Sequence, residues 1–242
     1  MTLDFRPHSR ITARTDSVGA ESSTVLVIDN FAADPQALVD HAASLGPFPP
    51  AQQTFYPGLR AAVPMGFVQA AQAYLDPALR AAFGLGDQVV VSGGWDFSLV
   101  TRPPAELTLR QRMPHIDSTH PGNLALLLYL APTDQGGTGF YRHRSTGYET
   151  ITEARFDHYE ASLKADVAKC GEPQGYICGD TPIFERIADY EPVFNRLLVY
   201  RGRSLHAASL RPDFRGSADP RMGRLTLNLF FHYRPKALMA QA

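Results

Sequence analysis

A histidine and an aspartate lie two positions apart near the middle of the chain, in the segment Met113-Pro114-His115-Ile116-Asp117. If this segment is a strand, the two side chains project from the same face, because successive side chains of a strand alternate between faces. One imidazole and one carboxylate on a rigid element could begin a metal site. The same pair could instead cap a loop where a strand begins, so metal binding requires a third ligand from elsewhere in the chain.

His206 can supply that third ligand. It follows the apolar run Leu197-Leu198-Val199-Tyr200, which predicts a strand, and a turn at Arg201-Gly202. Two imidazoles and one carboxylate that leave other coordination positions open are typical of non-heme Fe(II) sites. The open positions could hold O2 and a bidentate keto acid. We therefore predict that His115, Asp117 and His206 bind Fe(II).

The last predicted strand, residues 223–233, alternates polar and apolar side chains. Arg224, Thr226 and Asn228 share one face, and leucines share the other. If this strand has solvent on its outer side, the polar face is simply exposed. The run ending in Phe230-Phe231 favours a central strand, whose polar face would line a cavity. Arg224 could there form a bidentate pair with a carboxylate.

The composition indicates a soluble globular protein: 44% of the 242 residues are hydrophobic, 19% are charged, and the formal net charge is −1. A basic excess that would favour nucleic-acid binding is absent. We find neither a signal-peptide core nor an apolar run of the roughly 20 residues that a membrane helix requires. Cys170 and Cys178 match no zinc or redox motif, so reduced thiols in a cytoplasmic protein are expected, with a disulfide between them as the alternative.

The elements that must position these residues fall into two parts of one predicted domain, residues 1–242. Residues 1 to about 88 form a helix-rich part. It is predicted to contain, in chain order, a loose or edge-forming arm over 1–22, a buried strand at 25–28, a helix at 35–45, a proline-rich loop at 47–64 and a helix at 67–83 interrupted near Pro77.

Residues 89 to about 235 carry the strands. Val, Leu and aromatic runs between glycine and proline turns predict strands at 89–91, 96–101, 107–111, 124–130, 138–143, 183–190, 194–200 and 223–233. A helix is expected as an insertion over 152–169. The predicted fold class is mainly β with flanking helices (α+β), and the N-terminal helices pack on the sheet.

Several of these segments occur in an order and at spacings that resemble a known superfamily. They are Val27-Ile28-Asp29-Asn30-Phe31, Pro114-His115-Ile116-Asp117, Leu128-Tyr129-Leu130, Gly136-Gly137-Thr138-Gly139-Phe140, Asn195-Arg196-Leu197-Leu198-Val199-Tyr200, Leu205-His206 and Arg224-Leu225-Thr226. Together they resemble the Fe(II)/2-oxoglutarate-dependent dioxygenases, particularly the prolyl-hydroxylase-like branch. The resemblance covers about residues 24–45 and 95–235.

The resemblance implies a double-stranded β-helix (jelly-roll) core around the metal triad of His115, Asp117 and His206. It also implies that Arg224 anchors 2-oxoglutarate, assisted by Tyr129 and Thr226. With Fe(II) and O2, such an enzyme would hydroxylate a carbon of an amino acid, a peptide or a small metabolite and release succinate and CO2.

Several alternatives remain open at this point. Arg221 or Arg203 could replace Arg224 as the anchor. The protein could be a non-catalytic jelly-roll binding or regulatory protein, or a cupin-type metal enzyme that uses no 2-oxoglutarate. The substrate, a small molecule or a peptide, and the oligomeric state are not predicted.

Two further polar groups were considered as sites. Arg142-His143-Arg144 either forms a solvated turn or binds an anionic part of the substrate. His158 and Glu160 lie on a predicted helix, where residues two apart do not face each other, so they are expected to face solvent.

Overall fold

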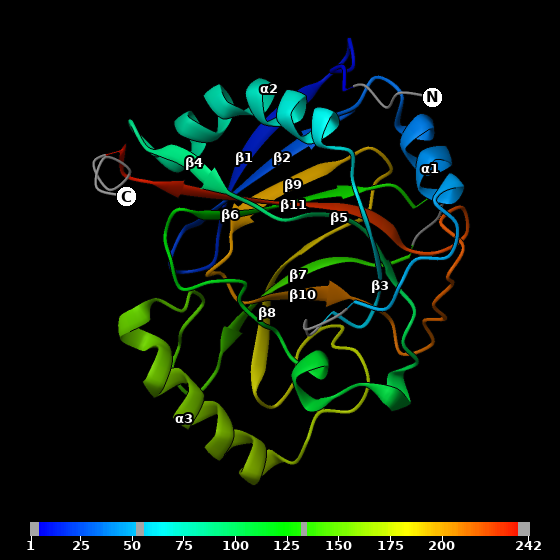
Figure 1. Ribbon diagram of the computed structural model, residues 1–242. Helices are drawn as coiled ribbons and strands as arrows, with labels where there is room; N and C mark the ends of the chain where they lie inside the picture. Colours follow the sequence, from blue (N-terminus) through cyan, green and yellow to red (C-terminus); the bar gives the residue numbers. More distant parts are fainter. Residues whose placement is uncertain (1–4, 52–55, 132–134, 237–242) are drawn as a thin grey trace.

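The computed structural model describes residues 5–51, 56–131 and 135–236, whose strands form two antiparallel β-sheets (Figure 1). Within these residues the large sheet contains eight strands and the small sheet three. Across the large sheet the order is β1 (Thr12–Val18), β2 (Ser23–Asp29), β9 (Leu197–Arg201), β6 (Asn123–Tyr129), β11 (Leu225–Arg234), β5 (Trp95–Val100) and β3 (Gly58–Ala62), with β4 (Val89–Ser92) paired to β11. The small sheet has the order β10 (His206–Ser209), β7 (Gly137–His143) and β8 (Phe184–Tyr190).

Two helices cover the outer face of the large sheet (Figure 1). The first, α1 (Pro35–Ser44), begins where the Asp34 carboxylate accepts a hydrogen bond of 2.9 Å from the Ala37 amide. The second, α2 (Met65–Phe83), ends at Gly84, whose φ of 60° suits glycine. Their apolar faces pack on every second side chain of the central strands, in a core that includes Leu38, Val39, Phe67, Leu75, Leu126, Val199 and Leu227.

A second core lies between the two sheets. The intervening side chains of the same strands point inward, because the side-chain period of a strand is two. Its members include Val25, Val27, Tyr129, Leu198 and Tyr200 from the large sheet and Phe140 and Tyr190 from the small sheet. Polar residues of β5 and β11 are buried as well: Ser98, Thr226 and Asn228. This interior therefore combines an apolar lining with a few polar groups, as ligand sites do.

The third helix, α3 (Glu153–Cys170), lies at the opposite end of the molecule from α1 and α2 (Figure 1). It packs through Tyr159 on a cluster that also contains small-sheet residues. Two short 3-10 helices, η1 (Pro104–Glu106) and η2 (Leu109–Arg112), lead to the His115 segment. In the described part of the chain, every helix is too short or too polar to cross a bilayer.

The predicted class, mainly β with flanking helices, is confirmed. The helices predicted at 35–45, 67–83 and 152–169 correspond to α1, α2 and α3. The expected interruption of α2 is wrong: the helix runs through Pro77, which removes the single hydrogen bond that its own amide would make and leaves the rest of the helix intact.

One predicted strand is wrong, and the segment that carries His115 and Asp117 does not form the strand that would place them on one face. Residues 107–111 contain most of η2, which begins with a capping box between Thr108 and Gln111. The segment 113–117 is not a strand, since it makes only one isolated bridge, from His115 to His206. Pro114 has no amide hydrogen for a ladder, which explains why pairing does not extend. Conversely, the predicted loop at 47–64, of which residues 52–55 lie outside the described part, contains β3.

Candidate metal centre

His115, Asp117 and His206 lie together at one end of the interior between the sheets. Each offers one ligand atom, and these atoms lie within 4.8 Å of one another. The Nε2 atom of His115 is 3.9 Å from Oδ1 of Asp117, and Nε2 of His206 is 3.5 Å from Oδ2. The side chain of His115 is 54% exposed and that of His206 only 6%. The cluster therefore lies between a buried wall and an accessible opening.

Main-chain hydrogen bonds join the His115 segment to His206, the first residue of β10, and to the turn of residues 201–204 that connects β9 to β10. The amides of His115 and His206 each donate to the carbonyl of the other, at 2.9 and 3.0 Å. The Asp117 amide donates to the carbonyl of Gly202 at 2.7 Å. Main-chain hydrogen bonds therefore position the three candidate ligands independently of what their side chains bind.

The His206 ring is oriented by a further hydrogen bond. Its Nδ1 lies 2.8 Å from the carbonyl oxygen of Ser204, and since a carbonyl only accepts, Nδ1 carries the proton. Nε2 is then left with a lone pair that points toward Asp117. Burial lowers the pKa of His206 to about 4, so the ring is neutral at pH 7, as a metal ligand must be.

The electrostatics of the other two residues are consistent with a cationic ligand. The pKa of Asp117 is raised, because burial outweighs the nearby His115 and Arg60, which lower it; a bound cation would offset this cost of burying the carboxylate. The pKa of His115 is lowered by desolvation and by its neighbour His206. Because the His115 side chain is half exposed, the proximity of the second imidazole is the cause that the geometry supports.

These residues fit a divalent transition metal. Bonds of about 2.1 Å at right angles place two ligand atoms roughly 3 Å apart. The separations of 3.5 and 3.9 Å therefore need only a small contraction around an ion. Two neutral imidazoles and one carboxylate, with one side open, suit Fe(II) among such metals. Within the described residues, no other group of three His, Cys, Asp or Glu side chains meets at this spacing.

Arg224 lies just before β11 and is 3% exposed. Its Nε and Nη2 donate to the carbonyls of Gly136 and Gly137, at 2.8 and 2.9 Å. The guanidinium carbon is 5.8 Å from the centre of the Tyr129 ring, whose hydroxyl lies 2.7 Å from the hydroxyl of Thr138. Nη1 donates no hydrogen bond to the described residues, so it stays available to a ligand.

The strand register extends this polar region across the large sheet. Arg60 of β3, Ser98 of β5, Thr226 of β11 and Tyr129 of β6 are directly opposite one another on four neighbouring strands. Opposite residues of paired strands lie on the same face, so the four form one row. Thr226 is fully buried in this row. The predicted cosubstrate residues Arg224, Tyr129 and Thr226 are therefore neighbours in the structure.

Arg60 is a further polar residue of this row that the sequence patterns did not indicate. Its guanidinium lies 4.6 Å over the ring of Tyr56 and 3.7 Å from the carboxylate of Asp96. Its Nε is buried and has no hydrogen-bond partner among the described residues. Its charge also lowers the pKa of Asp117, so it lies within electrostatic range of the candidate ligands. The short run Leu59 to Val63 between prolines was the available signal for a strand that could present this residue.

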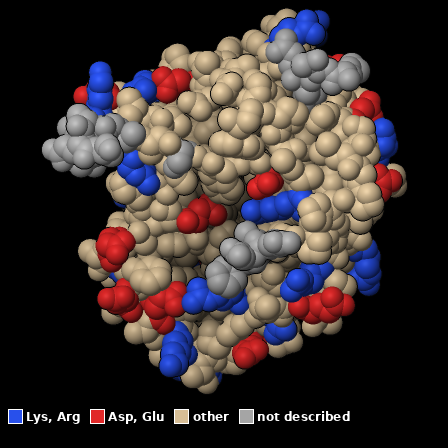
Figure 2. Space-filling model, viewed as in Figure 1, with Lys and Arg blue, Asp and Glu red and all other residues tan. Residues whose placement is uncertain are grey.

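Figure 2 shows that the molecule is hollowed between its upper half, which carries α1 and α2, and its lower half, which carries α3. Basic and acidic side chains stand at the edge of this hollow (Figure 2).

The other candidates of the sequence analysis lie elsewhere. Arg221 is exposed and pairs with Asp40 at 3.0 Å, which removes it from the interior. Arg203 belongs to the turn behind the ligands. Arg142 pairs with Glu149 at 2.6 Å and with Glu185, and Arg144 pairs with Asp180. Neither arginine is therefore a free site for a substrate anion, and the solvated-turn interpretation of Arg142-His143-Arg144 fails as well, since His143 is fully buried.

Replacing Gly202 with alanine should weaken metal binding without unfolding the protein. A Cβ at this position would lie 3.2 Å from the Cβ of Asp117, so Asp117 must move by a few tenths of an ångström. Such disturbances behind a ligand typically reduce metal affinity by about tenfold or more. Calorimetric titration with Mn²⁺ measures the change. Gly66→Ala, where nothing lies within 4 Å, is the matched control. Equal Mn²⁺ affinities in the two variants would contradict the arrangement.

Three solved structures resemble the chain at low sequence identity. The non-heme α-ketoglutarate-dependent carbocyclase SnoK from nogalamycin biosynthesis is 12% identical, with a TM-score of 0.45 over 92% of this chain and 88% of that one. HygX from Streptomyces hygroscopicus, solved with nickel and 2-oxoglutarate, is 14% identical, with a TM-score of 0.42 over 89% and 84%. An N-substituted L-amino acid dioxygenase from Burkholderia ambifaria AMMD is 11% identical, with a TM-score of 0.41 over 94% and 95%.

No curated protein matches the sequence. A sequence family described as a family of unknown function, DUF6445, matches residues 9–231. This match covers nearly the whole chain, including all the residues of the candidate metal centre and of the polar row. The protein is therefore a member of the DUF6445 family.

Proposed function

We propose that this protein is an Fe(II)- and 2-oxoglutarate-dependent oxygenase. It hydroxylates a carbon of an amino acid, a peptide or a small metabolite and releases succinate and CO2. The two sheets then form a double-stranded β-helix, or jelly-roll, core of the prolyl-hydroxylase-like type. That the chain forms a single domain and that the protein is cytoplasmic remain predictions.

The observation that carries the proposal is that the candidate metal ligands and a buried arginine face the same interior. Tyr200 connects them: its ring centre is 4.7 Å from that of His206. Burial raises the pKa of Tyr200, and the charges of Asp117 and Arg224 both act on it, so its side chain lies within range of both. A dicarboxylate that chelates a metal at one end and pairs with a guanidinium at the other suits this arrangement.

Each residue then has a defined role. His115, Asp117 and His206 would hold Fe(II), which supplies the activation of O2 and of the keto acid when it is bound. Arg224 would bind the distal carboxylate of 2-oxoglutarate through Nη1 and the second hydrogen of Nη2, because Nε and the first hydrogen of Nη2 are held by main-chain carbonyls. Tyr129 and Thr226 line the wall beside it.

Arg60 and Asp96 stand on the same face as this wall and are partly exposed, at 22% and 31% of their side chains. Their separation of 3.7 Å is longer than a hydrogen bond, so each keeps polar capacity for a bound molecule. We expect them to orient a charged substrate.

The two alternatives fit the interior less well. A cupin-type metal enzyme without a keto acid has no use for the charge and the remaining N–H groups of a buried guanidinium, which the two main-chain carbonyls do not neutralise. A non-catalytic binding protein has no need for an oriented, neutral His206 beside a carboxylate.

Anaerobic titration tests the proposal. Fe(II) and 2-oxoglutarate together should produce the weak visible charge-transfer band of a chelate, and neither alone should do so. 2-Oxoglutarate should also raise the melting temperature of the metal-loaded protein. A ligand that binds only the folded state adds RT ln(1 + [L]/Kd) to the free energy of unfolding. Metal binding without either response would instead support the cupin-type alternative.

A further inference from the structure

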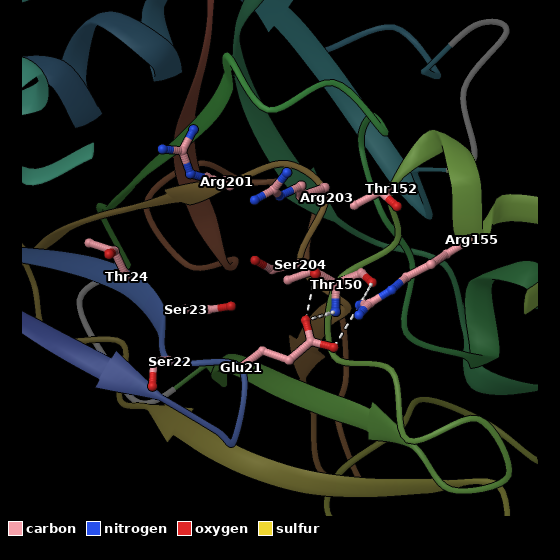
Figure 3. A pocket seen from close by; sticks show the side chains of 10 residues that line it. All are labelled: Glu21, Ser22, Ser23, Thr24, Thr150, Thr152, Arg155, Arg201, Arg203 and Ser204. Atoms are coloured by element: carbon pink, nitrogen blue, oxygen red, sulfur yellow. Dashed lines mark hydrogen bonds and ion pairs between the residues drawn. The ribbon is translucent and has the colours of Figure 1, made fainter. Parts of the chain in front are cut away.

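A cavity of about 520 Å³ is lined in part by the 201–204 turn, whose main-chain carbonyls contact two of the candidate ligands. Three segments line it: residues 21–24 at the β1–β2 turn, residues 150–155 before and within α3, and residues 201–204 (Figure 3). The ten residues of these segments that line the cavity are all polar or charged, so an apolar ligand would gain little there.

The lining carries an excess of positive charge. It contains three arginines and one carboxylate, which leaves a net charge of +2 (3 − 1). The carboxylate of Glu21 is already neutralised: it accepts hydrogen bonds from Arg155 at 2.7 Å and from the Thr150 hydroxyl at 2.5 Å (Figure 3). The unbalanced charges are therefore those of Arg201 and Arg203.

Neither of these two guanidinium groups has an acidic partner among the described residues. Arg201 donates only to the main-chain carbonyls of Phe83 and Pro121. The pKa of Arg201 is lowered by burial and by the nearby charge of Arg203. Arg203 makes no side-chain hydrogen bond or ion pair with the described residues, and its Nε is buried. Two like charges held this close favour a bound anion.

Hydroxyl groups complete the site. In Figure 3 the hydroxyls of Ser23 and Ser204 and the guanidinium of Arg203 point toward the same space. A planar guanidinium fork with two nearby hydroxyl donors suits an oxyanion that accepts several hydrogen bonds, such as a phosphate or a carboxylate group.

The same turn holds the candidate metal ligands. The carbonyl of Gly202 accepts the Asp117 amide, and the carbonyl of Ser204 accepts the His206 ring. An anion that fixes the side chains of this turn would therefore also restrict the two candidate ligands that its carbonyls hold.

We propose that this cavity binds a small oxyanion between Arg203 and the hydroxyls of Ser23 and Ser204, and that the bound anion increases metal affinity. The anion site itself does not depend on the proposed function. The coupling depends only on metal binding by the triad, whatever reaction follows.

Calorimetry and melting curves at constant ionic strength, with chloride as the reference, test the site with two probes: inorganic phosphate and acetate. At least one should bind the wild-type protein and raise its melting temperature. Arg203→Gln should reduce that affinity by at least about tenfold, the factor expected for a lost charge-assisted hydrogen bond. Arg211→Gln, which removes an exposed arginine outside the cavity, should change nothing. Ser23→Ala, at the cavity edge, provides a second variant if Arg203→Gln does not fold.

Which probe binds more tightly identifies the source chemistry, phosphate or carboxylate. Binding of neither up to about 10 mM would overturn the site. Equal affinity in Arg203→Gln and Arg211→Gln would also overturn it.

The coupling is tested with Mn²⁺ titrations in the presence and absence of sulfate, which resembles phosphate in shape and binds Mn²⁺ weakly. Sulfate should raise Mn²⁺ affinity by about fivefold in wild type and Arg211→Gln, the lower end of typical coupling, and should have no effect in Arg203→Gln. Reciprocally, Mn²⁺ should raise sulfate affinity by the same factor. An unchanged Mn²⁺ affinity in a protein that binds sulfate would overturn the coupling. Loss of Mn²⁺ binding in every variant would contradict the metal centre instead.

Discussion

Asp117→Ala should abolish metal binding and 2-oxoglutarate turnover together, while the protein stays folded. Asp117 would be the one anionic ligand of the triad, and its carboxylate oxygens lie 3.9 and 3.5 Å from the Nε2 atoms of His115 and His206. Neutral imidazoles do not offset the charge of a divalent ion, so the remaining pair binds weakly. Because residues that only support a ligand change affinity by up to about a hundredfold, loss of the ligand itself should reduce Mn²⁺ affinity by at least that factor.

The fold should survive because the contribution of Asp117 to the turn is its main-chain amide, which alanine retains. Calorimetric Mn²⁺ titration and succinate release are the two measurements. The matched control is Asp213→Ala, which removes a carboxylate from a side chain that is 78% exposed. A protein that keeps its Mn²⁺ affinity and its turnover after Asp117→Ala does not use this triad.

Arg224→Ala should raise the 2-oxoglutarate concentration needed for half-maximal succinate release by at least about a hundredfold. Two charge-assisted hydrogen bonds to a carboxylate are each worth roughly 1.5–3 kcal/mol, and 2.7 kcal/mol corresponds to about a hundredfold. Arg224→Lys should have an intermediate effect, because lysine keeps the charge without the planar fork. Mn²⁺ affinity should change little, since Arg224 makes no hydrogen bond or ion pair with the triad.

The structure adds a second effect of this substitution. The Arg224 side chain bonds the carbonyls of Gly136 and Gly137, so alanine also removes two internal hydrogen bonds and should lower the melting temperature. Measurements must therefore be made below the melting temperature of the variant. Arg221→Ala, at the exposed arginine that pairs with Asp40, serves as the control. A normal 2-oxoglutarate dependence in Arg224→Ala would exclude this residue as the anchor.

The sequence was informative where a local pattern determines the structure. The apolar run 124–130 could only be a buried element, and it became β6 at the centre of the large sheet. The polar alternation of Arg224, Thr226 and Asn228 correctly indicated a buried polar face on the last strand. The three residues proposed as ligands from their types and spacing are brought together in the structure, although their binding of iron is untested.

The sequence was less informative where distant contacts decide. β3 lies between prolines, and its residues have little intrinsic preference for a strand. It forms because it pairs with β5 at five positions along the edge of the sheet. Arg60 was overlooked for the same reason. The His115 segment would have placed His115 and Asp117 on one face only as a strand, yet its position depends on hydrogen bonds to residues nearly a hundred positions later, which no local pattern could indicate.

The mutual backbone pairing of His115 and His206 has a consequence for how the centre assembles. The two histidines are 91 positions apart (206 − 115). Bringing them together closes a long loop, and the chain loses the conformational entropy of that loop once, when the sheets form. Because two amide–carbonyl bonds secure this closure, an ion encounters ligands that are already adjacent and contributes none of the closure free energy itself. Chain closure therefore comes first and the ion second, so a bound ion should slow unfolding far more than it accelerates folding.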